Sequence, residues 1–100
     1  MIKKIIKCGA GWCAPCKALE PIFLEVEKEH NDTIDFKEIN VDNARGEDFD
    51  FIEQNNVRSI PTVFFLDEND NILHKEVGYM PKDKFNELID KLNVQNVDKK

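Results

Sequence analysis

The chain has 100 residues, of which 41% are hydrophobic and 34% charged, and its formal net charge is −6. This length and composition predict one soluble globular domain with its own core, which we expect to be a monomer. The acidic balance disfavours nucleic acid and anionic membranes as partners. No apolar stretch approaches the ~20 residues that span a bilayer. The basic start at residues 1–7 lacks the apolar run of a signal peptide, so we expect a cytoplasmic protein.

The first half of the chain alternates strands and helices. The pattern predicts a strand over residues 2–8, a helix over 14–30, a strand over 34–41 and a short helix over 47–55. The long helix depends on apolar side chains at helical spacing, beginning with Leu19 and Phe23. The short helix should turn Phe49 and Ile52 inward, with Phe51 as a further candidate.

The second half predicts two more strands, over residues 62–66 and 72–77, and a last helix ending near Leu92. The first three strands are joined through helices, so we expect them to be parallel, with right-handed crossovers. The fourth follows a short turn and should be an antiparallel edge strand. Residues 1–92 therefore predict an α/β domain of order βαβαββα, with a four-stranded mixed sheet flanked by three helices. Residues 93–100 should form a frayed tail.

The hexapeptide Trp12-Cys13-Ala14-Pro15-Cys16-Lys17 indicates a redox-active dithiol. A helix that begins just after Cys13 points its free N–H groups and positive dipole end at that sulfur. A thiolate is stabilised there, which makes Cys13 the nucleophile and the more exposed thiol. Cys16 lies one turn further, more buried, and is placed to resolve the mixed disulfide.

Structural cysteines and a metal site are the alternatives. Cys8, Cys13 and Cys16 have the spacing that begins a plant-type iron–sulfur motif, but the chain has only 3 cysteines. Zinc would have to recruit His30 or His74, and neither lies at finger spacing. We therefore expect no metal and no bound cofactor. Cys8 is interpreted as a small buried hydrophobe, with a regulatory thiol as the alternative. His30 should lie at a helix C-terminus and His74 in solvent.

The hexapeptide closely resembles the thioredoxin active site, usually written Trp-Cys-Gly-Pro-Cys-Lys, with Ala14 in place of the glycine. The resemblance runs from about Ile2 to Leu92 and includes residues 57–62. By that resemblance the Ile60–Pro61 bond is cis and stacks against the dithiol. The family pairs the backbone of the residue before this proline with an extended substrate, which implies that role for Ile60.

The resemblance also implies a substrate groove around the dithiol. Gly78 matches the family's glycine before the last helix, which lets a substrate chain approach closely. The implied substrate-binding residues are Trp12, Ala14, Pro15, Ile60, Pro61, Gly78 and Tyr79, with Met80 also at the rim.

The sequence departs from the family pattern in two ways. Only 12 residues precede Cys13, so we expect the usual N-terminal strand and helix to be missing. Lys7 occupies the position of the family's buried Asp, and Glu38 that of its frequent Lys. We expect a buried or half-buried Lys7–Glu38 pair beneath the dithiol, with Glu38 as candidate base for Cys16 and Lys7 as its electrostatic partner. Alternatively both side chains extend outward and take no catalytic part.

The resemblance implies a protein disulfide reductase. Its partners would be disulfide-containing target proteins and a thioredoxin-reductase-type electron donor. One alternative is a glutaredoxin-like, glutathione-dependent reductase, which the short N-terminus favours. The other is a thioredoxin-fold adaptor that binds a partner protein, which the intact dithiol and Lys17 disfavour.

Overall fold

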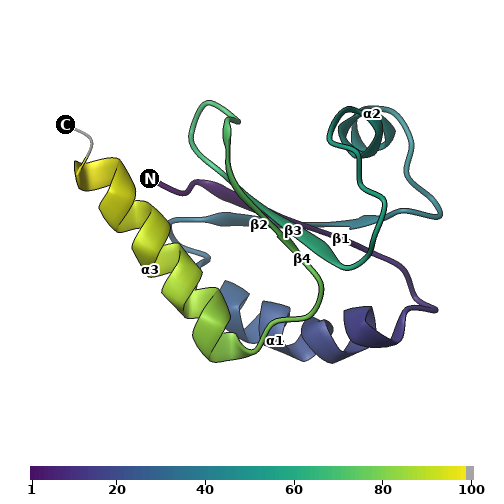
Figure 1. The fold of residues 1–100 in the computed structure, drawn as a ribbon, viewed down its shortest axis with the longest axis horizontal. Helices are drawn as coiled ribbons and strands as arrows, with labels where there is room; N and C mark the ends of the chain where they lie inside the picture. The colour runs from purple at the N-terminus through teal and green to yellow at the C-terminus, as the bar shows by residue number, and fades with distance from the viewer. Residues whose placement is uncertain (99–100) are drawn as a thin grey trace.

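The structure, a computed structural model, describes residues 1–98. Its elements are β1 (Lys4–Gly9), α1 (Ala14–His30), β2 (Asp35–Asn40), α2 (Glu47–Gln54), β3 (Thr62–Leu66), β4 (Ile72–Val77) and α3 (Lys82–Asp98). Helices α1 and α3 cover one face of the sheet and α2 covers the other (Figure 1). The predicted α/β fold, with its four-stranded sheet and three helices, is confirmed.

The strand order is β2-β1-β3-β4, and β1 runs parallel to β2 but antiparallel to β3. The expectation of three parallel strands is therefore wrong for β3. Figure 1 shows α2 end-on while the strands run across the view, so α2 crosses the sheet instead of running back along it. The start of β3 therefore lies at the same end of the sheet as the end of β2, and the two strands run in opposite directions. Cys8 is accordingly paired with both Ile39, near the end of β2, and Thr62, at the start of β3.

The last helix is longer than predicted. Helix α3 passes Leu92 and ends at Asp98, because no Gly or Pro follows Leu92 to stop it. Fraying of the tail stays a prediction, and residues 99–100 lie outside the described part of the chain. Helix α1 continues through Pro21.

Each face of the sheet carries its own core. The larger cluster lies under α1 and α3 and contains Phe23, Phe65 and Phe85. The Phe85 ring centroid lies 6.2 Å from that of Phe23 and 5.7 Å from that of Phe65. The Phe65–Phe85 pair is edge-to-face and the Phe23–Phe85 pair is tilted, and aromatic pairs at such distances stabilise a core.

The smaller cluster lies on the opposite face and is covered by Phe51 and Ile52 of α2. The predicted inward orientation of Phe49 is wrong, since its side chain is 50% exposed. Helix α2 buries a single stripe against the sheet, and Phe49 lies beside that stripe.

A third cluster joins Ala10, Cys13 and Cys16, with Ile60 packed against it. It lies at one end of the sheet, where β1 ends, α1 begins and the loop before β3 returns. The fold therefore brings both cysteines and the Ile60–Pro61 segment together.

Candidate active site

Cys13 and Cys16 form a disulfide at the N-terminus of α1. Their Cα atoms are 5.2 Å apart. Cys13 is the N-cap residue, and the backbone N–H of Cys16 donates a hydrogen bond to its sulfur over 3.2 Å. Pro15 occupies the first turn, where its missing N–H costs the helix nothing. The N-terminus of α1 therefore stabilises negative charge on Cys13 once the disulfide opens.

The two cysteines are equally buried in the disulfide form. Cys13 is 4% exposed and Cys16 is 5% exposed, so the expectation that Cys13 is the more exposed thiol is wrong here. The reason is the loop before β3, since Cys13 Sγ lies 3.7 Å from the carbonyl oxygen of Ile60. Exposure therefore does not show which cysteine is the nucleophile. Their positions differ, because Cys13 is the N-cap residue of α1 and Cys16 lies within its first turn.

The Ile60–Pro61 peptide bond is cis, as the resemblance implied. Pro61 is buried, and Ile60 packs against the dithiol cluster. The N–H of Gly78 donates a hydrogen bond to the carbonyl oxygen of Pro61 over 2.7 Å. Gly78 has φ +98°, a conformation that strongly favours glycine. Gly78 therefore fixes the end of β4 to the loop that carries the proline.

Exposed aromatic side chains lie on the segments that flank the dithiol. Trp12 is 69% exposed and Tyr79 is 48% exposed, and Ala14 and Pro15 also lie at the surface. Met80 was expected at the rim but is only 1% exposed. Its side chain belongs to the larger core cluster, because the chain turns inward there to begin α3.

Trp12 is held by a residue that the sequence analysis missed. Its Nε1–H donates to Asp42 Oδ2 over 2.7 Å, and the N–H of Asp42 donates to Asn40 Oδ1 over 2.9 Å. Trp12 follows β1 and Asp42 follows β2. The carboxyl ends of neighbouring parallel strands meet at one edge of a sheet. The positions of Trp12 and Asp42 shortly after two such strands could therefore have predicted that they lie close together.

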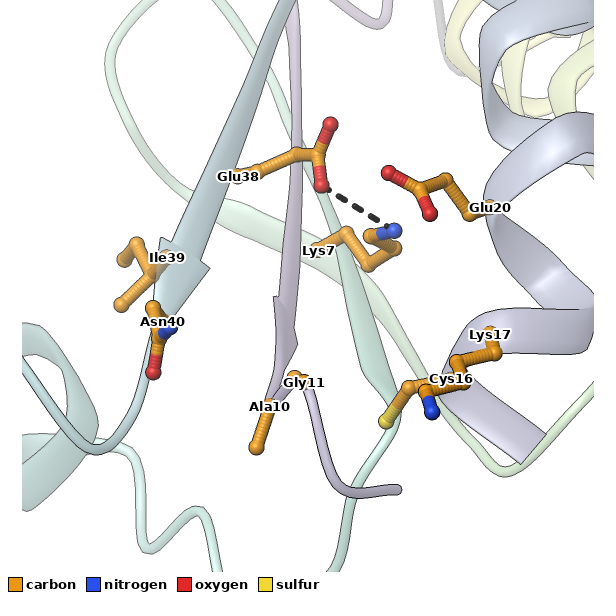
Figure 2. Close-up of a pocket in the computed structure, with 10 residues that line it drawn as sticks. Lys7, Ala10, Gly11, Cys16, Lys17, Glu20, Glu38, Ile39 and Asn40 are labelled. Atoms are coloured by element: carbon orange, nitrogen blue, oxygen red, sulfur yellow. Dashed lines mark ion pairs between the residues drawn. The ribbon is translucent and has the colours of Figure 1, made fainter. Parts of the chain in front are cut away.

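Lys7 and Glu38 form the expected ion pair. They are register neighbours on parallel strands, and Lys7 Nζ lies 3.1 Å from Glu38 Oε1 (Figure 2). The side chain of Lys7 is 6% exposed and that of Glu38 is 46% exposed. Lys7 Nζ also lies 5.1 Å from the ring centroid of Phe23, within cation–π range. The alternative that both side chains extend outward is wrong for Lys7, which is buried, whereas the side chain of Glu38 is half exposed. Their catalytic part stays a prediction.

A cavity of about 340 Å³ connects this pair with the dithiol. Its lining includes Lys7 and Glu38 from the sheet and Cys16, Lys17 and Glu20 from α1. The Glu20 carboxylate points toward the Lys7 amine (Figure 2). Glu20 is not among the site residues expected from the sequence. It lies four residues after Cys16 on α1, a spacing that puts two side chains on one helix face.

Cys8 is a buried residue of the smaller core cluster, with 0% of its surface exposed. Burial raises the pKa of its thiol to about 11, and the Asp48 carboxylate adds to that rise. Burial as a small hydrophobe is therefore confirmed.

We expect Cys8 to be inert in the folded protein. Thiolate is the reactive form, and a pKa of about 11 leaves very little of it at pH 8. The oxidised protein should bind no thiol reagent when native and one equivalent after unfolding in guanidinium. Rapid native labelling of Cys8 would contradict this burial, and Cys8→Ala is the matched control.

The two histidines lie away from the dithiol chemistry. His30 Nε2 lies 3.3 Å from Asn86 Oδ1. The expectation that His74 is solvated is wrong, because it is half-buried against Phe65 and its Nε2 lies 2.8 Å from Glu76 Oε1. Over residues 1–98 no group of three or more His, Cys, Asp or Glu side chains is arranged to hold a metal ion.

The comparisons with known proteins agree with this geometry. The family model for thioredoxin matches residues 2–91. The chain belongs to the thioredoxin family. It is 36% identical over 87 residues to a thioredoxin of Mycoplasmoides gallisepticum, covering 87% of this chain and 81% of that one. It is 33% identical to a thioredoxin of Bacillus subtilis, covering 82% of this chain and 74% of that one.

A third relative is the M-type chloroplastic thioredoxin of Spinacia oleracea. The identity is 37% over 82 residues, which cover 82% of this chain and 42% of that protein. Family membership and the adjacent cysteines make this protein a thiol-disulfide oxidoreductase, a disulfide reductase. None of the helices in residues 1–98 has the length and apolar character needed to cross a membrane.

Proposed function

We propose that this thioredoxin-family protein reduces disulfides in other proteins through Cys13 and Cys16. The observation that carries the proposal is the N-cap position of Cys13, whose sulfur accepts the N–H of Cys16 over 3.2 Å. The Cys13 thiolate attacks one target sulfur, and the other target sulfur leaves as a thiolate. Cys16 then loses its proton and attacks Cys13 Sγ, which releases the second target thiolate. The target gains two electrons and the Cys13–Cys16 disulfide forms.

The target would bind across the loop that carries Ile60. An extended peptide can add main-chain hydrogen bonds to the backbone beside Pro61, with its side chains against exposed aromatic surface. Trp12 and Tyr79 offer such surface, with Ala14, Pro15 and Gly78 completing the groove. Gly78 leaves room there, because a Cβ built on it would meet nothing within 4 Å.

The second step needs a proton acceptor for Cys16. The cavity that Cys16 lines also reaches Glu38, whose carboxylate is half in solvent and paired with the buried ammonium of Lys7. We propose that Glu38 accepts this proton, directly or through water, while Lys7 fixes its position. Glu38 is then the base, and Lys7 a positioning residue.

The electron donor in this proposal is a thioredoxin-reductase-type enzyme in the cytoplasm, where thiols are kept reduced. The test follows reduction of insulin disulfides by the purified protein. One arm supplies NADPH and thioredoxin reductase, and the other supplies NADPH, glutathione and glutathione reductase. Turnover in the first arm supports the proposal.

Turnover only with glutathione would instead identify a glutaredoxin-like reductase. Turnover in neither arm would contradict the reductase proposal. Full biological activity of a variant with both Cys13→Ser and Cys16→Ser would then identify an adaptor.

A further inference from the structure

A second carboxylate faces the buried amine of Lys7. Glu20 lies on the second turn of α1 and lines the cavity beside Cys16, and its carboxylate points toward the Lys7 amine (Figure 2). Side chains on a helix lean toward its N-terminus, which directs Glu20 toward the turn that carries Cys16. Within residues 1–98 Glu20 forms no ion pair of its own. Its charge can therefore act on a cation in this cavity.

Of the two cations in the lining, Lys7 has the greater need of a counter-ion. Lys17 is exposed, so water screens its charge and a fixed partner stabilises it little. The side chain of Lys7 is 6% exposed, and its Nζ lies 3.1 Å from Glu38 Oε1. The ring of Phe23, 5.1 Å from the same Nζ, is a weaker partner than a carboxylate.

Neutralising Glu38 would leave the Lys7 ammonium without its counter-ion. Removing one charge of a buried pair is strongly destabilising, because the other charge stays behind uncompensated. Any reaction step that protonates Glu38 therefore needs a second anion near Lys7.

The proposed transfer of the Cys16 proton is such a step. The Cys16 thiol and the Glu38 carboxylate become a thiolate and a neutral carboxylic acid. The thiolate attacks Cys13 Sγ, the bond from Cys13 to the target breaks, and the target sulfur leaves as a thiolate. The negative charge thus passes from Glu38 to Cys16 and leaves with the target, while the proton stays on Glu38 until water removes it. In that interval Glu20 is the one carboxylate left among the described residues that line the cavity.

We infer that Glu20 is a positioning residue for resolution, which pairs with the Lys7 ammonium while Glu38 is protonated. This inference rests on the proposed function and deepens it, because it adds a residue to the step at which Glu38 acts. The two carboxylates approach the Lys7 amine from different elements, Glu38 from β2 and Glu20 from α1 (Figure 2). A lysine side chain has a flexible four-carbon stem, so the ammonium can exchange partners without movement of the backbone.

The structural test uses Glu38→Gln, because the amide is a neutral group of the same shape as protonated Glu38. We expect a crystal structure of this variant to place Lys7 Nζ within ~4 Å of a Glu20 carboxylate oxygen, the distance of an ion pair. A Lys7 amine that has not moved toward Glu20 would overturn the inference.

The kinetic test follows the reduced protein as it reacts with dithiobis(nitrobenzoate), a chromogenic disulfide. Attack by Cys13 releases one thionitrobenzoate and resolution by Cys16 releases the second, so one absorbance trace reports both steps. Glu20→Gln should slow the second release about tenfold, a small part of the ~10²–10⁴ that general base catalysis contributes. The first release should not change, which a disturbed fold would not allow.

Glu27→Gln is the matched control, because Glu27 also lies on α1 but does not line the cavity. It should change neither release. Because Glu20 acts through Lys7, adding Glu20→Gln to Lys7→Met protein should slow the second release no further. A second release as fast in Glu20→Gln protein as in the unsubstituted protein would overturn the inference, as would a further tenfold slowing in Lys7→Met protein.

The same trace separates this inference from the proposed function. A second release that is slow in Glu38→Gln protein and unchanged in Glu20→Gln protein rejects the role of Glu20 alone. A second release that is unchanged in both variants also rejects Glu38 as the base. The insulin assay tests the reductase proposal independently of either residue.

Discussion

A Cys13→Ser variant is expected to lose reduction of insulin disulfides completely, down to the rate without protein. The hydroxyl of Ser cannot replace the thiolate that the N-terminus of α1 stabilises. The fold should be unaffected, because Ser differs from Cys by one atom and the surrounding contacts remain. Insulin precipitation measures the activity, and thermal unfolding under reducing conditions controls for stability.

The companion variant Cys16→Ser should stop the reaction halfway. Cys13 still attacks a target, but no second thiol releases it, so a mixed disulfide between Cys13 and the target accumulates. Mass spectrometry of the trapped complex identifies the linked cysteine. A complex linked through Cys16 in Cys13→Ser protein, with none through Cys13 in the companion variant, would falsify the assignment.

The second large effect is expected from reversing one charge of the Lys7–Glu38 pair. Lys7→Asp places a carboxylate where the Lys7 side chain is only 6% exposed and where Glu38 faces it. We expect a loss of about 3 kcal/mol in the free energy of unfolding, the lower end of the range for broken buried pairs, because Glu38 is half exposed. Urea denaturation measures this loss.

The double swap, Lys7→Asp with Glu38→Lys, should recover more than half of that loss, since the opposite charges again face each other across β1 and β2. A double variant no more stable than the Lys7→Asp single variant would show that the pair does not interact as described.

Glu38→Gln separates catalysis from stability at the same pair. It should slow the release of trapped targets by Cys16 and leave the attack by Cys13 little changed. Glu53→Gln on α2 is the matched control for loss of one carboxylate, because Glu53 does not line the cavity. Release at the original rate would show that Glu38 is not the base.

The site was predictable where it depends on neighbours in the chain. The two cysteines one helical turn apart, with Pro15 between them, specify a helix N-terminus and a dithiol by local geometry alone. The Lys7–Glu38 pair was also predictable, because the long helix α1 returns the chain across the sheet, so β1 and β2 are parallel and their register places these residues side by side.

The residues that sequence analysis missed come from different elements. Asp42, which holds Trp12, lies on the loop after β2, and Glu20 reaches the cavity from the second turn of α1. The side chains of both are ordinary surface carboxylates in the sequence. They become part of the site because the loop after β2 and the start of α1 lie at the same end of the sheet.

The sequence by itself determined the elements and their order, because apolar periodicity, helix caps and turn residues act over a few residues. The direction of β3, the burial of Met80 and the equal burial of Cys13 and Cys16 were decided by tertiary structure. The first depends on how α2 crosses the sheet, the second on how the start of α3 packs into the larger core, and the third on how the loop at Ile60 closes over the dithiol. Such contacts join residues far apart in the chain, where local patterns carry no information about approach or direction.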